Sequence, residues 1–238
     1  YLVKADGRIQ VDVAYLGQHN AGGQLRFRTN SPEIALRVEL RRAEFLPHMP
    51  LTGVSGMDVY AGTGAASRFI GSVKPAGAQD IRYEGVLALR GGGPSPEIAS
   101  VVYPLPDREG LTDITVNFPL YNGVRRVEVG VKPGSLLGVP TPHTVPLPLG
   151  VYGSSITQGA CASRPGLCYA AHLARWIDAP MINTGCSGNG MGQPAMADFL
   201  GSRPMSVLVM DYDYNALSVD WLRDTHEPFF RRILEKQP

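Results

Sequence analysis

The stretch "PLPLGVYGSSITQGACASRPG", residues 146–166, places a short apolar run directly before two serines. Residues 149–152 predict a buried β-strand, and Ser154 and Ser155 follow at its carboxyl end. In an open parallel sheet, ligands bind beyond the carboxyl ends of the strands. A reactive serine at the edge of a parallel sheet is therefore the first hypothesis that the sequence suggests.

The rest of the C-terminal part alternates between strand and helix patterns. Strands are expected at 149–153, 180–185 and 206–212, and helices from about 165, near 194–200 and over a last segment to about 236. Ser218 fits the N-cap of the last helix, and Pro228 should interrupt it. This βαβαβα order predicts an α/β domain with a parallel sheet over 149–238.

The N-terminal part has the alternating pattern of antiparallel strands. Hydrophobic residues recur at every second position in "EIALRVEL" (33–40), "DITVNFPL" (113–120) and "RRVEVGV" (125–131). Shorter strands are expected at 10–16, 25–29, 57–61, 68–73, 81–89 and 98–103. The pair Asn122-Gly123 between the last two long runs predicts a tight type I′ hairpin. We therefore expect a β-sandwich of the jelly-roll type over 1–138, followed by a Pro-rich linker over 139–148.

The composition argues against several classes of partner. The 238 residues include 22 Lys and Arg against 21 Asp and Glu, and no basic stripe favours nucleic acid. No apolar run approaches the roughly 18 residues of a membrane helix. Cys161, Cys168 and Cys186 form no even framework, although a 161–168 disulfide is open. Cys168 and His172 lie four positions apart without a second cluster, so we expect neither a metal nor a cofactor.

Polar or glycine-rich segments follow all three predicted strands of the α/β domain. They are the serines at 154–155, "NTGCSGNG" at 183–190 and "DYDYNA" at 211–216. A serine, its own backbone N–H, a glycine and an asparagine side chain would together form a nucleophile with an oxyanion hole. Structural roles remain open alternatives: the serines could only cap the next helix, Gly188 could only form a turn, and Asn215 could cap a helix.

These segments resemble the sequence blocks of the SGNH hydrolases, also called GDSL esterases. "GSSITQG" is similar to the first block, with Ser154 where the family usually has Asp. The resemblance implies a three-layer, flavodoxin-like domain in which Ser155 is the nucleophile, with Gly188 and Asn215 as oxyanion residues of the second and third blocks. "SGMDVY", residues 55–60, resembles the Gly-x-Asp-Leu-Tyr signature of a two-domain branch with an N-terminal β-sandwich.

One block of that family has no counterpart. The family takes its general base from an Asp-x-x-His block near the C-terminus, which this sequence lacks. The five histidines are His19, His48, His143, His172 and His226, and none is a persuasive base. A helix after a parallel strand should deliver a further strand to the sheet, yet the sequence stops soon after such a helix. We therefore expect the C-terminal part of the α/β domain to be missing, with the catalytic His and Asp beyond Pro238.

The expected function is that of a serine esterase or deacetylase that works through an acyl-enzyme on a carbohydrate or small-molecule ester. One alternative is an acyltransferase that moves an acyl group from a thioester to a hydroxyl of a tetracycline-type polyketide in antibiotic biosynthesis. Another is a non-catalytic carbohydrate-binding protein, if no chain follows Pro238. Arg164 and His48 are candidate substrate contacts, with structural roles open for both. The composition suggests a bacterial protein, cytoplasmic if an acyltransferase and exported if a carbohydrate esterase.

Overall fold

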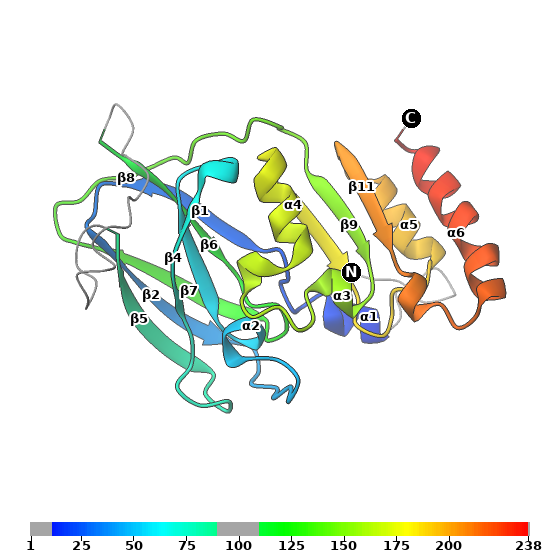
Figure 1. Cartoon of the computed structure of the whole chain (residues 1–238), viewed down its shortest axis with the longest axis horizontal. Coiled ribbons are helices and arrows are strands. Elements are labelled where there is room, and N and C mark those ends of the chain that lie inside the picture. Colours follow the sequence, from blue (N-terminus) through cyan, green and yellow to red (C-terminus); the bar gives the residue numbers. More distant parts are fainter. Residues whose placement is uncertain (1–10, 90–109, 238) are drawn as a thin grey trace.

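The computed structural model describes residues 11–89 and 110–237, and its N-terminal part contains two antiparallel sheets (Figure 1). One sheet has the strand order β4-β3-β6-β1-β8 and the other has the order β5-β2-β7. Their strands are β1 (Gln24–Thr29), β2 (Glu33–Leu40), β3 (Met57–Ala61), β4 (Arg68–Val73), β5 (Arg82–Ala88), β6 (Thr112–Asn117), β7 (Val124–Val131) and β8 (Leu137–Gly138). The expected antiparallel N-terminal part is confirmed.

The two sheets share a core because their strands alternate apolar and polar residues. Ile34, Leu36 and Val38 of β2 are each at most 1% exposed. They belong to one cluster with Val116 of β6. Between them, Arg37 lies on the exposed face of the same strand. One face of each sheet is thus buried against the other, which fixes the register of the strands.

A three-stranded parallel sheet forms the C-terminal part, as the alternation of strands and helices predicts. Its order is β10-β9-β11, and its strands are β9 (Leu149–Gly153), β10 (Met181–Gly185) and β11 (Val207–Asp211). Its helices are α3 (Ser155–Gln158), α4 (Tyr169–Ile177), α5 (Pro194–Gly201) and α6 (Val219–Leu234). The chain crosses from β9 first to β10 on one side and then to β11 on the other. The end of β9 is therefore the point where strand order reverses, and such sheets bind ligands there.

Both faces of the parallel sheet are covered, which explains why its central strand is apolar throughout. On one face, Leu149 and Val151 pack with Ala170 and other residues of α4. On the opposite face, Tyr152 packs with residues of α5 and α6, including Phe229. Helix α4 lies on the side that faces the sandwich, and α5 and α6 lie on the far side (Figure 1).

Several details of the predicted secondary structure are wrong. The strand expected at 10–16 is instead the helix α1 (Val11–Leu16), in which Val13 and Leu16 pack near Tyr152 one helical turn apart. Pro228 lies inside a continuous α6 and does not interrupt it. The cap is confirmed, since the Ser218 hydroxyl accepts the backbone N–H three residues later at 3.0 Å. The strand expected at 98–103 lies outside the described residues.

The hairpin expected at Asn122-Gly123 is also wrong, because β6 and β7 belong to different sheets. Asn122 is fully buried, where its side chain accepts the Glu44 N–H at 3.0 Å and donates to the Ser55 hydroxyl at 2.8 Å. A Cβ on Gly123 would lie 1.9 Å from the Gln18 carbonyl oxygen. Asn122 therefore forms buried hydrogen bonds, and Gly123 allows a close approach of the Gln18 backbone, where the chain passes from one sheet to the other.

The Pro-rich segment is hydrogen-bonded to both parts of the protein. The Thr141 hydroxyl donates to Asp113 of the sandwich at 2.7 Å. The Thr144 hydroxyl donates to Asp178, just before β10, also at 2.7 Å. These contacts on both sides restrict how the sandwich and the parallel sheet move relative to one another.

Candidate functional site

The three polar segments meet at one edge of the parallel sheet. The last residues of β9, β10 and β11 are paired directly with one another, as Gly153 with Gly185 and with Asp211. Ser155, Gly188 and Asn215 follow these strand ends by two, three and four residues. The parallel register therefore brings all three candidate residues to the same edge.

The first serine caps helix α3 and leaves the second one free. Ser154 is fully buried with an extended backbone, and its hydroxyl accepts the Ile156 N–H at 3.2 Å. Ser155 is the first helical residue and is half-buried. Within the described residues its hydroxyl has no hydrogen-bond partner. The sequence leaves capping open as an alternative role for both serines. In the structure only Ser154 caps α3.

Helix α3 is held against the ends of both neighbouring strands. A Cβ on Gly185 would lie 2.1 Å from the Gln158 nitrogen, so glycine allows α3 to approach the end of β10. Asn183 of β10 donates to the Thr157 carbonyl at 2.9 Å, and the Thr157 hydroxyl donates to the Asp211 carboxylate at 3.0 Å. These contacts fix the backbone on which Ser155 is carried.

Gly188 lies in a turn that follows β10. The Cys186 carbonyl accepts the N–H groups of Asn189 and Gly190, at 2.8 and 3.0 Å. Gly188 has a φ of +69°, which favours glycine, and no atom lies within 4 Å of a Cβ built there. It is exposed, and its N–H has no acceptor among the described residues.

Asn215 reaches the same turn from the other neighbouring strand. Its Oδ1 accepts the Gly190 N–H at 3.3 Å, while its Nδ2 has no acceptor in the described part of the chain. The Ser155 N–H lies in the first turn of α3, where no intrahelical acceptor exists. Three N–H donors without partners thus lie on elements that end together at this edge. Such a set of donors is what an oxyanion hole requires.

Comparisons with known proteins show the family to which the chain belongs. Residues 147–238 match a model described as the GDSL-like lipase/acylhydrolase family, and residues 3–137 match a GxDLY model described as the N-terminus of SGNH-hydrolase-type esterases. The chain belongs to the GDSL/SGNH hydrolase family. No curated protein sequence gives a significant match.

Several solved structures resemble this chain over most of its length. A Bacteroides ovatus protein described as a GDSL-like lipase is 27% identical, with a TM-score of 0.80 over 97% of this chain and 62% of the other. A salicylyl-acyltransferase from a tetracycline biosynthetic pathway is 18% identical, with a TM-score of 0.67 over 99% and 59%. A family two carbohydrate esterase from Clostridium thermocellum, in complex with cellohexaose, is 11% identical, with a TM-score of 0.55 over 91% and 68%. The chain thus spans about three fifths of the first two structures.

The five histidines are the candidates for a general base within this sequence. All five lie in the described residues, and none is hydrogen-bonded to Ser155. His143 does pair with a carboxylate, since its Nδ1 lies 2.9 Å from Asp178 Oδ1. However, Asp178 lies before β10, at the amino ends of the strands, and a strand of five residues spans about 16 Å. This pair therefore lies at the opposite edge of the sheet from Ser155.

The Gly-x-Asp-Leu-Tyr-like motif clamps one peptide of the catalytic part. Asp58 is fully buried, and its carboxylate accepts the Gly166 N–H and the Asn117 side-chain N–H, both at 2.8 Å. Burial raises the pKa of Asp58, whereas these two hydrogen bonds oppose that rise. A Cβ on Gly166 would lie 2.5 Å from the Tyr60 ring. The motif thus holds the segment between α3 and α4 against the sandwich.

Arg164 and His48, the candidate substrate contacts, do not join the Ser155 group. The Arg164 guanidinium lies 3.7 Å from the centre of the Phe69 ring and 3.4 Å from the Tyr60 hydroxyl. It also lies 3.9 Å from the Asp58 carboxylate, so it belongs to the clamp. His48 is exposed and makes no polar contact with the described residues. A role in substrate binding stays a prediction for both.

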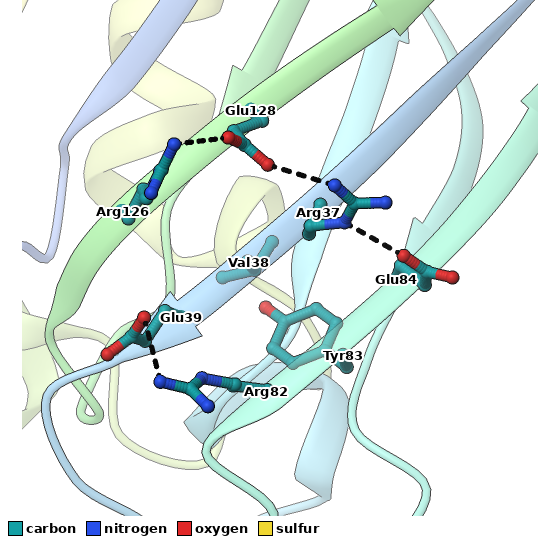
Figure 2. Close-up of a pocket in the computed structure, with 8 residues that line it drawn as sticks. All are labelled: Arg37, Val38, Glu39, Arg82, Tyr83, Glu84, Arg126 and Glu128. Atoms are coloured by element: carbon teal, nitrogen blue, oxygen red, sulfur yellow. Dashed lines mark hydrogen bonds and ion pairs between the residues drawn. The ribbon is translucent and has the colours of Figure 1, made fainter.

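A concavity of about 620 Å³ lies elsewhere, on the outer face of the β5-β2-β7 sheet (Figure 2). Arg37 lies between Glu84 and Glu128, at 3.0 and 3.3 Å, and Glu39 lies 3.5 Å from Arg82. The opposite charges balance one another, and exposed pairs of this kind contribute little to stability. The hollow therefore presents no group prepared for chemistry.

The cysteines are other potential nucleophiles in the parallel-sheet part of the chain. The three cysteines are free, so the open 161–168 disulfide does not form. Burial raises the pKa of Cys186, beside Gly188, to about 12, so its thiol is a poor nucleophile at neutral pH. In the described part of the chain, no group of three potential ligands could hold a metal, and no helix is long and apolar enough to cross a membrane.

The contact between two buried polar residues beside the edge is not predicted from the sequence. They are Gln158, the last residue of α3, and His19, whose Nδ1 lies 2.9 Å from the Gln158 amide nitrogen. The pair is separated by 139 positions, so no local pattern connects them. The only local signal is the pair Gln158-Gly159 at the end of "GSSITQG".

Proposed function

We propose that the chain carries the nucleophile and the oxyanion hole of a serine esterase. Ser155 Oγ attacks the ester carbonyl carbon, its proton passes to a general base, and the carbonyl oxygen becomes an oxyanion. The N–H groups of Ser155 and Gly188 and the side chain of Asn215 stabilise that charge. The alcohol leaves with a proton, and water then cleaves the acyl-enzyme.

One observation carries this proposal: Ser154 supplies the helix cap, so the Ser155 hydroxyl is free at the sheet edge that also holds three N–H donors without partners among the described residues. Because none of the five histidines is hydrogen-bonded to Ser155, we propose that the base of this reaction is none of them. Removal of a triad member leaves only residual catalysis from the oxyanion hole and binding. The proposal therefore concerns the protein that also supplies that base.

A carbohydrate or other small-molecule ester is the proposed substrate class. The GDSL-like lipase at 27% identity supports an ester substrate, and the carbohydrate esterase in complex with cellohexaose shares the fold. An acyltransferase differs only in the acceptor, because a hydroxyl compound in place of water attacks the same acyl-enzyme. The ratio of hydrolysed to transferred product, with and without added sugar alcohols, distinguishes the two.

The test is turnover of a nitrophenyl acetate by the native protein and by Ser155→Ala, with thermal melting as the folding control. We expect the variant to melt normally and to lose turnover and labelling by a fluorophosphonate. Asn215→Ala should lower kcat by roughly 10²–10³-fold with little change in KM. A folded Ser155→Ala protein with near-normal turnover would show that the nucleophile lies elsewhere.

A further inference from the structure

Gln158 is a buried side chain in contact with both parts of the protein. It is 1% exposed and ends the helix that begins with Ser155. Its Oε1 accepts the Ser187 N–H at 3.0 Å, and its Nε2 donates to the Leu120 carbonyl at 3.1 Å. The same Nε2 lies 2.9 Å from His19 Nδ1. One amide therefore links the Gly188 turn to the sandwich.

The orientation of this amide is fixed by its two backbone partners. The Ser187 N–H can only donate and the Leu120 carbonyl can only accept, so a flipped Gln158 amide would lose both bonds. With Nε2 toward His19, the Nδ1 of that ring must be the acceptor. The two polar atoms of the Gln158 amide and the Nδ1 of His19 thus each have one assigned role.

No side chain packs around Gly188 itself, so the direction of its N–H depends on the hydrogen bonds of the residues beside it. No atom lies within 4 Å of a Cβ built on Gly188, and the residue is exposed. The two peptides on either side of Ser187 are held by hydrogen bonds, and the second of them carries the Gly188 N–H. Gln158 accepts the Ser187 N–H, and the Asn189 side chain donates to the Ser187 carbonyl at 3.0 Å.

We propose that Gln158 is a positioning residue that sets the direction of the Gly188 N–H relative to Ser155, using the sandwich as its support. This inference rests on the proposed function. Gln158 itself is buried and does not touch substrate. It acts because the same short helix carries Ser155 at its start and the support of the Gly188 turn at its end. A displacement of about 1 Å in such a donor costs on the order of 10²-fold in rate.

Gln158→Met tests the proposal, because methionine nearly matches the volume of glutamine and removes all three hydrogen bonds. We expect kcat on a nitrophenyl acetate to fall about 10–100-fold, with KM changed less than about 3-fold. Amide hydrogen exchange at residues 187–190 should rise at least about 10-fold. Gln158→Glu should recover part of both losses, because a carboxylate oxygen can still accept the Ser187 N–H.

Val38→Ala, in the sandwich core, is the matched control for general loss of stability. It should lower the melting temperature without changing kcat or exchange at residues 187–190. If Gln158→Met keeps normal kcat and normal exchange, or shifts kcat no more than Val38→Ala does, Gln158 is not a positioning residue. Full turnover by Ser155→Ala would instead overturn the proposed function, and the exchange measurement would still decide whether Gln158 holds the turn.

Discussion

The buried His19 gives a sharp prediction about stability and pH. It is 2% exposed, with Gln158 Nε2 at 2.9 Å from Nδ1 and Arg42 Nη1 at 3.3 Å from Nε2. Both neighbours are hydrogen-bond donors, so neither favours an added proton on the ring. Burial first, and then the charge of Arg42, lower the pKa of His19 from 6.5 to about 4.

The sign of the effect follows from the two protonation equilibria. Between pH 6.5 and about pH 4 the unfolded chain binds a proton at this position and the native protein does not. His19 therefore stabilises the native state fully above pH 6.5, and this contribution is lost as the pH falls toward 4. At about 1.4 kcal/mol per pH unit, the interval corresponds to roughly 3 kcal/mol near pH 4.

The assay is urea unfolding of the native protein and of His19→Gln at pH 7 and pH 4.5. The wild type should lose about 2.5 kcal/mol more than the variant over this interval, as an order of magnitude. Comparison of the two proteins removes the contributions of other titrating groups. His48→Gln is the matched control, because His48 is exposed, and it should behave as the wild type. Parallel losses in wild type and His19→Gln would refute the reasoning.

Three further outcomes follow from the contacts of the site. Ser154→Ala should lower the free energy of unfolding by about 1 kcal/mol through loss of the α3 cap, and Ser155→Ala should not; equal effects would contradict separate roles. Gly166→Ala should cost about 1–3 kcal/mol by thermal melting, because its Cβ would meet the Tyr60 ring; an unchanged melting temperature would show that the clamp is loose. Residues 139–238 alone should bind a hydrophobic dye and melt without a sharp transition, because Leu120 leaves with the sandwich; a cooperative melt would show an independent domain.

The position of the candidate site can be predicted from the sequence because strand periodicity and the polar segments after strands are local signals. Once 149–153, 180–185 and 206–212 are recognised as parallel strands, their carboxyl ends must lie together. The candidate residues then follow from which polar side chains come directly after each strand. No knowledge of tertiary contacts is needed for this step.

The parts that the sequence does not predict depend on contacts between distant segments. Asn122-Gly123 has hairpin chemistry, yet Asn122 bonds Glu44 and Ser55, which no local pattern reveals. The helix α1 is short and alternates like a strand, and its packing on Tyr152 decides its form. Nothing local to Gln158 predicts that its side chain is buried, because its partners Leu120 and His19 lie far away in the sequence.

The same distant contacts connect the sandwich to the strand and the helix that carry Ser155. Leu120 and Tyr121 of the sandwich lie in one buried cluster with Leu149 and Val151 of the strand that leads to Ser155. The Asp58 clamp holds the segment after α3, and Gln158 ties the end of α3 to the Leu120 carbonyl. A rotation of the sandwich would therefore open a shared core and break buried hydrogen bonds at once. Because β9, α3 and the Gly188 turn all contact this interface directly or through Gln158, we expect the geometry around Ser155 to depend on the sandwich.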